Sequence, residues 1–415
     1  MTAALWYNSV MKKIFLTAFV FLIIQGIVCA QTGISFVYIN GSNTNSEKSR
    51  SGFLKGVQKL HPIMKKQFEK NDRIFELFLQ NGQYKINKTP RIFFWGYNSE
   101  KDLLFVKQRL DISKALGPTL AYQVRGILTA FLHDAIWIQK KHNMKKVLDE
   151  LNEVIKDEYA KGNETVLYGY SAGSFITYEY FFNKLPYLNL EKLFDGLNAS
   201  DNLKTYIKQN PKSDTCISAL QTAGVGVVSE DGHLLFDRNE DNFKTNYDKL
   251  DLMTENYCMP KGAVKGIVNF ASPLVLFYSD LSDPDYDLTY YNKLMLKYIA
   301  ENGLFLLTVN YREDPLGFPT SQNLTLDEIS EIAETDIVDP KGFVFDNSFI
   351  WGKRSCLVAH TSYWTTRKTF AKAVVKSYLY GYDFQYDEDF QKKVINSRKY
   401  KRINKNIKHD IKNEI

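Results

Sequence analysis

The segment GYSAG at residues 169–173 places Ser171 between two glycines, Gly169 and Gly173. A serine hydroxyl is a strong nucleophile only when a base takes its proton, an acid orients that base, and hydrogen-bond donors stabilise the oxyanion. The preceding run at 165–169, TVLYG, is strand-like, and an amphipathic segment follows the serine. This context favours a nucleophile elbow, a sharp strand-to-helix bend that presents the hydroxyl. A glycine-rich bend without chemical function is the alternative.

The stretch VLYGYSAGS resembles the nucleophile elbow of the α/β-hydrolase family, in particular of its lipase-like and esterase-like members. The resemblance implies a catalytic serine, acid and histidine that follow successive strands in that order. Ser171 is then the nucleophile. The resemblance extends over most of residues 33–380, but its specific motifs are confined to four short stretches.

The resemblance places the triad acid after a late strand. Residues 303–310, GLFLLTVN, read as a buried strand, and Asp314 follows in the order Asp-Pro-Leu-Gly, which is similar to the lipase pattern. Asp314 is therefore the predicted acid, and Glu313 is the alternative one residue earlier. Asp280 and Asp283, after the preceding strand, are further candidates. An Asp-Pro turn without catalytic function is the alternative interpretation of this segment.

One histidine lies between Asp314 and a final amphipathic helix. His360 stands in CLVAHTSYWTTRKTFAKAV, where a strand-like apolar run precedes it. Lipase-like members place their catalytic histidine in a similar loop, so His360 is the predicted base. A histidine with a structural function is the alternative. His133 precedes the serine and is expected to have a structural function near Asp134.

Two backbone N–H groups are expected to bind the oxyanion. One belongs to Ala172, directly after the serine, and the resemblance places the other in the loop that follows the first strand of the mature chain. In FVYINGSNTN, Gly41 stands where many relatives have a His-Gly pair, but Asn40 replaces the histidine. Ser42 is the first candidate for the second donor and Asn43 is the alternative. An ordinary Asn-Gly turn would need neither.

Strand-like apolar runs alternate with helical patterns along the 415 residues, which predicts an α/β three-layer fold with a mainly parallel sheet. Such folds gather functional residues at the carboxyl ends of their strands. Because the mature chain starts on a strand, we expect the sheet to lack the first two strands of the α/β-hydrolase family. The predicted strands are residues 33–40, 91–98, 165–169, 264–272 and 303–310. The predicted helices are residues 51–68, 116–141, 144–159, 178–185, 290–302 and 368–379.

The N-terminus is typical of an exported protein. Basic residues at 12–13 precede an almost continuously apolar run at 14–27, and small residues then allow cleavage before Gln31. Residues 1–30 are therefore predicted to be a signal peptide, with residues 1–10 as an upstream extension. The protein is expected to be periplasmic or extracellular, and an uncleaved membrane anchor is the alternative.

The basic charge of the chain is concentrated at its C-terminus. The formal net charge is +6, but residues 392–415 contain nine lysines and arginines against two acidic residues, so residues 31–391 are slightly acidic. Residues 31–391 are the predicted α/β-hydrolase domain. The tail is predicted to be a solvated helix, with contact to an anionic membrane surface as the alternative. No nucleic-acid partner is expected.

A long insertion, residues 183–262, separates the predicted serine-bearing helix from the next strand. Connections of this kind usually have about 2 to 6 residues, so we expect a cap that covers the substrate cleft. A surface excursion without function is the alternative. Cys216 and Cys258 could form a disulfide within the cap, or could be free thiols. The apolar residues available to face the cleft are Leu185, Tyr187, Leu188, Leu190 and Leu193.

No nucleotide-binding, dinucleotide-binding or zinc motif occurs in the sequence, and neither a cofactor nor a metal is expected. The acidic stretch at 280–287 could bind Ca²⁺, but a solvated loop is the favoured interpretation. The sequence thus predicts a secreted serine esterase or lipase that cleaves small-molecule or lipid esters through an acyl-enzyme. The alternatives are an acyltransferase or thioesterase with the same triad, and a non-catalytic binding protein that retains the fold.

Overall fold

The structure is a computed structural model, and it describes the greater part of the predicted α/β domain. The predicted signal peptide, most of the insertion and the last part of the basic tail lie outside the described residues. Within the described part of the chain, no helix is long and apolar enough to cross a membrane. The described residues are 32–42, 47–114, 133–184, 227–228, 234–235, 259–278, 293–318, 324–332, 337–350 and 355–397.

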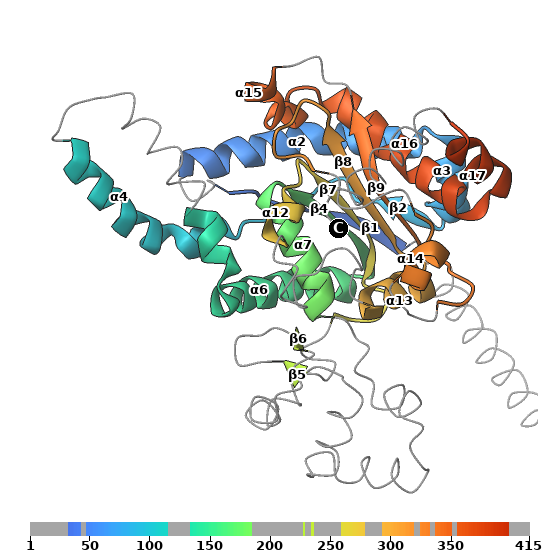
Figure 1. The fold of residues 1–415 in the computed structure, drawn as a ribbon, viewed down its shortest axis with the longest axis horizontal. Helices are drawn as coiled ribbons and strands as arrows, with labels where there is room; N and C mark the ends of the chain where they lie inside the picture. Colours follow the sequence, from blue (N-terminus) through green and yellow to red (C-terminus); the bar gives the residue numbers. More distant parts are fainter. Residues whose placement is uncertain are drawn as a thin grey trace, which may run out of the picture.

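A seven-stranded sheet forms the middle layer of the described chain (Figure 1). Its order is β2-β1-β4-β7-β8-β9, and β3 also pairs with β1. All of these pairs are parallel. A separate antiparallel pair joins β5, Val227–Val228, to β6, Leu234–Leu235. The strands of the main sheet are β1 Thr32–Ile39, β2 Tyr84–Ile86, β3 Arg91–Phe93, β4 Asn163–Tyr170, β7 Val264–Phe270, β8 Phe305–Tyr311 and β9 Phe343–Ile350.

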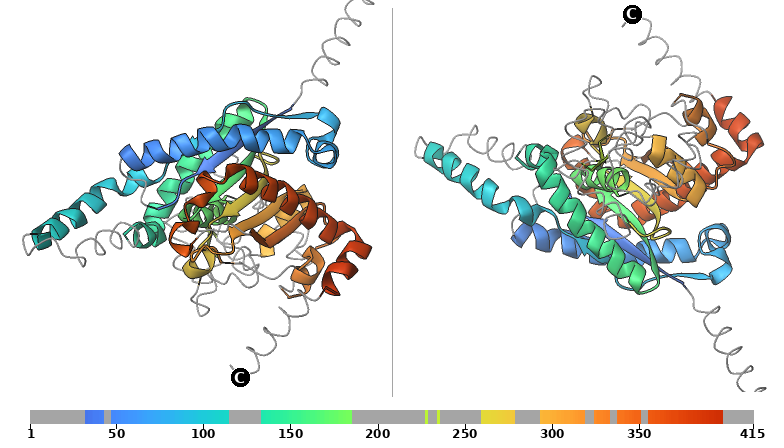
Figure 2. Two further views of the ribbon diagram at one scale, coloured as in Figure 1. Left: turned by 90° about the horizontal axis from the view of Figure 1, so that it is seen from above. Right: turned by 90° about the horizontal axis from the view of Figure 1, so that it is seen from below.

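Helices cover both faces of the sheet, which confirms the predicted α/β three-layer architecture. In Figure 1, α2 and α16 lie above the sheet, and α6 and α13 lie below it, while α4 extends away from the layers (Figure 2). The helices are α2 Glu47–Glu69, α3 Asp72–Leu77, α4 Glu100–Lys114, α6 Lys141–Ala160, α7 Ala172–Asn183, α12 Leu274–Phe277, α13 Lys293–Asn302, α14 Leu326–Ile332, α15 Cys356–Ala359, α16 Arg367–Tyr386 and α17 Glu388–Ile395. The described residues also form the short 3₁₀ helices η1 Gln80–Gly82, η2 Gly96–Ser99 and η6 Ser362–Trp364.

The side chains of β1 explain why the sheet needs a helical layer on each face. Phe36 and Tyr38 belong to the buried cluster with α2 and α16, whereas Val37 and Ile39 belong to the cluster with α6, α7 and α13. Successive side chains of a strand point to opposite faces, so a continuously apolar strand must be covered twice.

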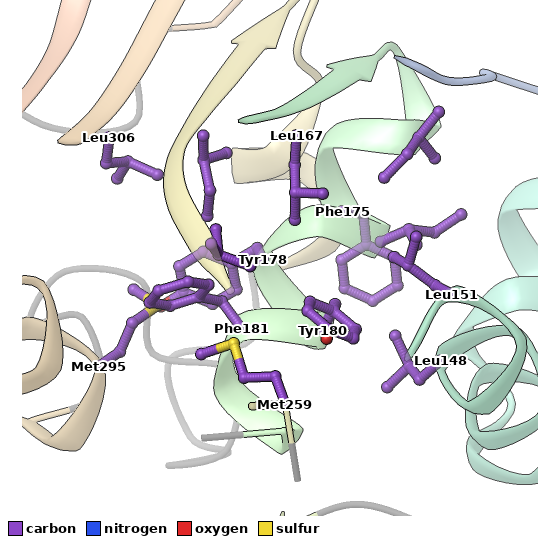
Figure 3. Packing of buried hydrophobic residues seen from close by; sticks show 14 of the residues in the cluster. Leu148, Leu151, Leu167, Phe175, Tyr178, Tyr180, Phe181, Met259, Met295 and Leu306 are labelled. Carbon is purple, nitrogen blue, oxygen red and sulfur yellow. The ribbon is translucent and has the colours of Figure 1, made fainter. Parts of the chain in front are cut away.

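Apolar contacts with α6 help to hold α7, the helix that follows Ser171, against the sheet. Figure 3 shows Leu148 and Leu151 of α6 facing Tyr180 and Phe175 of α7. Phe175 and Tyr180 are almost completely buried. Burial of a large apolar side chain stabilises the folded state by about 1.5–3 kcal/mol, so these contacts fix the position of α7.

Several element predictions were wrong in detail. The strand expected at 91–98 ends at Phe93 and is followed by η2, because the Trp95 backbone N–H donates a hydrogen bond to the Asn40 side chain and leaves the sheet ladder. The strand-like run before His360 is the short helix α15. Strand β9 and helix α4 were not predicted. The polar residues at 346–347 interrupt the apolar run of β9, so its sequence lacks the pattern of a buried strand.

The remaining element predictions agree with the structure to different extents. The helix expected at 178–185 begins earlier, at Ala172. Most of the helix expected at 116–141 lies outside the described residues, and residues 133–139 are helical. The described sheet starts at β1. The expected absence of two strands is defined relative to the α/β-hydrolase family, so it stays a prediction.

Candidate active site

The GYSAG segment forms a sharp bend between β4 and α7. Strand β4 ends at Tyr170 and α7 begins at Ala172, so Ser171 alone makes the connection. Its φ of 52° and ψ of −124° lie in a region that residues other than glycine rarely adopt. Such backbone strain is often found at functional sites. Ser171 is 2% exposed.

The two glycines of the bend permit backbone contacts that a side chain would prevent. A Cβ atom on Gly173 would lie 2.7 Å from the Ile39 carbonyl oxygen and 2.8 Å from the Asn40 carbonyl oxygen. A Cβ atom on Gly169 would lie 2.8 Å from the carbonyl oxygen of Gly173. The elbow therefore packs directly on the end of β1.

We expect Gly173→Ala to lower the free energy of unfolding by about 1–3 kcal/mol, because the new methyl group must displace backbone atoms of β1. Denaturant unfolding of the two proteins measures the difference. Gly52→Ala is the matched control. Gly52 lies in α2 with open space around it, and alanine there should stabilise the helix by up to about 1 kcal/mol. Equal effects at the two positions would contradict the packing argument.

Ser171, His360 and Asp314 form a chain of hydrogen bonds. His360 Nε2 lies 3.0 Å from Ser171 Oγ. His360 Nδ1 lies 3.0 Å from Asp314 Oδ1 and 3.2 Å from Asp314 Oδ2. All three distances are hydrogen-bond distances. Because the carboxylate can only accept, Nδ1 carries the proton of a neutral ring and Nε2 accepts from the serine hydroxyl. This arrangement allows the imidazole to remove the proton of Ser171.

The sheet order brings the three residues together from distant parts of the chain. Strands β4, β7 and β8 are neighbours, so the turn after β8 lies near the elbow after β4. In that turn the Leu316 backbone N–H donates to Asp314 Oδ1 at 3.0 Å. His360 follows α15, and the Tyr170 hydroxyl donates to its backbone carbonyl at 2.9 Å. The residue before the serine thus fixes the loop that carries the histidine.

Burial differs along the hydrogen-bond chain. The Asp314 side chain is completely buried, whereas the His360 side chain is 20% exposed. The carboxylate is therefore shielded from water, while the edge of the imidazole remains accessible. Shielding strengthens the attraction between the carboxylate and a protonated imidazole.

A buried polar network also connects the elbow to the turn that carries Asp314. Ser174 Oγ donates to the Ser171 carbonyl at 2.6 Å and accepts from Ser272 Oγ at 2.9 Å. The Ser272 backbone N–H donates to Asn310 Oδ1, and Asn310 Nδ2 donates to the Phe318 carbonyl. Sequence reasoning missed these residues. Polar residues at the ends of otherwise apolar strands are the signal that could have found them.

The loop after β1 lies against Ser171. A Cβ atom on Gly41 would be 2.7 Å from the Ser171 Cβ atom. Asn40 shapes the loop, because its Oδ1 accepts from the Trp95 backbone N–H and its carbonyl accepts from Trp95 Nε1. Ser42 follows, and its Oγ is buried with no hydrogen-bond partner among the described residues. Buried hydroxyl groups normally have a partner, so a ligand oxygen would fit here.

The other predicted oxyanion donor, Ala172, is the first residue of α7 and is buried. N–H groups in the first turn of a helix have no intrahelical acceptor, so this one is available for an oxyanion. Ala172 and the Ser42 loop therefore both adjoin Ser171. The alternative donor, Asn43, lies outside the described residues.

The alternative catalytic residues are not brought together in the same way. His360 Nδ1 is paired with Asp314 and not with its neighbour Glu313. His133 Nδ1 lies 3.4 Å from Asp134 Oδ1, and Ser99 Oγ donates to the same oxygen. This arrangement agrees with the structural function expected for His133.

Several predicted features lie outside the described residues, namely Asp280, Asp283 and the acidic stretch at 280–287, Cys216, Cys258 and the apolar residues of the predicted cap. The cap therefore stays a prediction. Among the described residues, no group of three or more histidine, cysteine, aspartate or glutamate side chains could hold a metal ion.

Comparisons of the chain with protein-family models, with curated proteins and with solved structures find no match. The geometry of the site is therefore the main guide to the function of this protein.

Proposed function

We propose that this protein is a secreted serine hydrolase that cleaves carboxylic esters of small molecules or lipids through an acyl-enzyme. The observation that carries the proposal is the hydrogen-bond chain from Ser171 Oγ through His360 to Asp314. Its serine lies on a strained bend between a strand and a helix. This geometry agrees with the resemblance of the elbow motif to the lipase-like α/β-hydrolases.

In the proposed reaction, Ser171 Oγ attacks the ester carbonyl while His360 Nε2 takes its proton. The tetrahedral intermediate then collapses, and His360 returns the proton to the leaving alcohol. A water molecule, deprotonated by the same nitrogen, attacks the acyl-enzyme. When the second tetrahedral intermediate collapses, His360 returns the proton to Ser171 Oγ and the acid is released. Asp314 orients the imidazole and stabilises the imidazolium that forms in both steps. The mechanism needs no cofactor.

The oxyanion of each intermediate is proposed to bind between Ala172 and Ser42. The Ala172 N–H supplies one donor, and the loop at Ser42 supplies the other. The buried Ser42 hydroxyl supports this position, because it has no hydrogen-bond partner within the described part of the chain. An oxyanion would satisfy it, and donors that are already in place stabilise developing charge strongly.

We expect Ser42→Ala to lower kcat by roughly 10- to 100-fold with little change in KM, because the hydroxyl contact strengthens as the oxyanion forms. Steady-state hydrolysis of a short-chain aryl ester measures both constants. Ser377→Ala is the matched control, since this buried serine of α16 donates to the Ala373 carbonyl. If Ser42→Ala retains the full kcat, the Ser42 hydroxyl does not contact the oxyanion.

A fluorophosphonate probe tests the proposed function directly. Such a probe reacts with a serine that an adjacent base has activated. We expect stoichiometric labelling, with the modified peptide containing Ser171. A folded protein that remains unlabelled would instead support the non-catalytic binding protein. Addition of an alcohol acceptor to the esterase assay separates hydrolysis from acyl transfer, because transfer yields a new ester.

Export and the character of the basic tail are further parts of the proposal that rest on the sequence. The predicted signal peptide supports a periplasmic or extracellular location. The basic tail is proposed to be a solvated helix, with contact to an anionic surface as the alternative. At the start of the tail, Lys392 of α17 pairs with Glu388 at 3.2 Å. Exposed pairs of this kind contribute little stability.

A further inference from the structure

The Asp314 carboxylate makes more hydrogen bonds than orientation of His360 requires. Oδ1 accepts from the Leu316 backbone N–H and from His360 Nδ1, each at 3.0 Å. Oδ2 accepts from the Tyr363 hydroxyl at 3.0 Å and lies 3.2 Å from His360 Nδ1. Both oxygens of the carboxylate are therefore held, and Tyr363 is the one side-chain donor besides the histidine in the described contacts.

The environment of Tyr363 determines the direction of its hydroxyl hydrogen. The hydroxyl oxygen accepts the Tyr311 backbone N–H at 2.7 Å, so its own hydrogen is directed to Asp314. The ring is completely buried, with ring centroids of Tyr311 at 4.4 Å and Phe370 at 5.4 Å. Burial, reinforced by the charge of Asp314, raises the pKa of Tyr363 well above its ordinary value. The hydroxyl thus remains a donor at neutral and moderately alkaline pH.

We infer that Tyr363 is a positioning residue that holds the Asp314 carboxylate and, by sharing its charge, limits the basicity of His360. A hydrogen bond donated to a carboxylate stabilises its negative charge and weakens its attraction for a neighbouring cation. The inference deepens the proposed function and rests on it for any catalytic consequence. Its effect on the protonation of His360 is independent of turnover.

The groups that face His360 come from four elements. Asp314 approaches from the turn after β8, and Tyr363 approaches that carboxylate from η6. Ser171 contacts Nε2 from the elbow, and Tyr170 of β4 contacts the His360 backbone and has its ring centroid 5.6 Å away. Burial raises the pKa of Tyr170, so this residue is neutral as well. Among these contacts, Asp314 is the charged group.

The sign of the effect follows from these contacts. In Tyr363→Phe the ring remains, but Asp314 Oδ2 loses a donor, so more of the carboxylate charge acts on the imidazole. The protonated imidazole is then favoured over the neutral ring in the variant, so His360 should lose its proton at a higher pH than in the wild-type protein. A tyrosine with a merely structural function would change stability without moving this titration.

An NMR titration of the histidine side chains tests the inference without requiring activity. The expected result is a higher His360 midpoint in Tyr363→Phe than in the wild-type protein. Tyr38→Phe is the matched control, because the Tyr38 hydroxyl contacts a different histidine, His61 Nδ1, at 3.4 Å. It should affect His61 and leave the His360 midpoint unchanged. Equal His360 midpoints in Tyr363→Phe and the wild type would overturn the inference.

A second substitution covers the case in which Tyr363→Phe does not fold. Incorporation of 3-fluorotyrosine at position 363 keeps the ring and the Tyr311 contact but gives a more acidic hydroxyl, which donates a stronger hydrogen bond. The His360 midpoint should then move downward. An upward movement or no movement would overturn the inference.

The catalytic readout separates this inference from the proposed function. If Ser171 is the nucleophile, His360 must be neutral to act as base, so the acid limb of the kcat/KM profile should move upward in Tyr363→Phe together with the NMR midpoint. Displaced NMR midpoints in a protein that neither hydrolyses esters nor reacts with fluorophosphonate would support the positioning function of Tyr363 and reject the esterase.

Discussion

Replacement of Ser171 by alanine is expected to lower the hydrolysis of short-chain aryl esters by about 10⁴-fold or more, since members of a catalytic triad act as a unit. The substitution removes the oxygen that lies 3.0 Å from His360 Nε2. The backbone of the elbow is held in place by β4 and α7, which the substitution does not change. We therefore expect the folded state to be nearly unchanged.

The measurement combines kcat/KM for the aryl ester with a thermal melt of each protein. Ser377→Ala again serves as the control, because it also removes a largely buried hydroxyl but one in α16. Turnover of Ser171→Ala close to that of the wild type would reject Ser171 as the nucleophile. A large loss in both variants would point to damage of the fold.

Asp314→Asn is expected to lower turnover by roughly 10³- to 10⁴-fold while the protein remains folded. The substitution removes the charge that stabilises the imidazolium. An amide group can also donate to His360 Nδ1, which would favour the wrong tautomer of the ring. The loss should appear mainly in kcat, because the substituted group lies behind the histidine and away from the substrate.

The neighbouring substitution Glu313→Gln is the matched control for the acid, since it removes a charge one residue away. It should retain most of the activity, because the contacts of His360 Nδ1 are with Asp314. The assignment of the acid fails if Glu313→Gln abolishes turnover and Asp314→Asn does not. Steady-state kinetics of the three proteins at one pH distinguishes these outcomes.

The elbow could be predicted from sequence because its constraints are local. Ser171 and its flanking glycines must be adjacent in the chain for the bend to form, so a short motif carries the information. Asp314 and His360 were found through their order along the chain, and the structure places both within hydrogen-bond distance in the same chain of contacts. Element boundaries near these residues were less accurate.

The contacts that support the site could not be predicted from sequence. Tyr363 donates to a carboxylate 49 residues away, and Ser272 bonds to a serine 98 residues away. Such contacts depend on the register of neighbouring strands and on side-chain rotamers, which no local pattern specifies. Helix α15 was misread as strand-like because four apolar residues have no measurable period.

The sheet has a consequence for how the protein folds. Every pair in it is parallel, and parallel strands cannot be joined by a tight hairpin. For example, β1 pairs with β4, so Gly33 lies opposite Asn163, although the two residues are far apart in the sequence. The chain must close long loops before the sheet gains its first hydrogen bonds, and topologies dominated by such contacts fold slowly. Since His360 lies beyond the last strand of the sheet, an incomplete chain would contain Ser171 without the proposed base. The proposed esterase activity would therefore be absent until the C-terminal helices had docked.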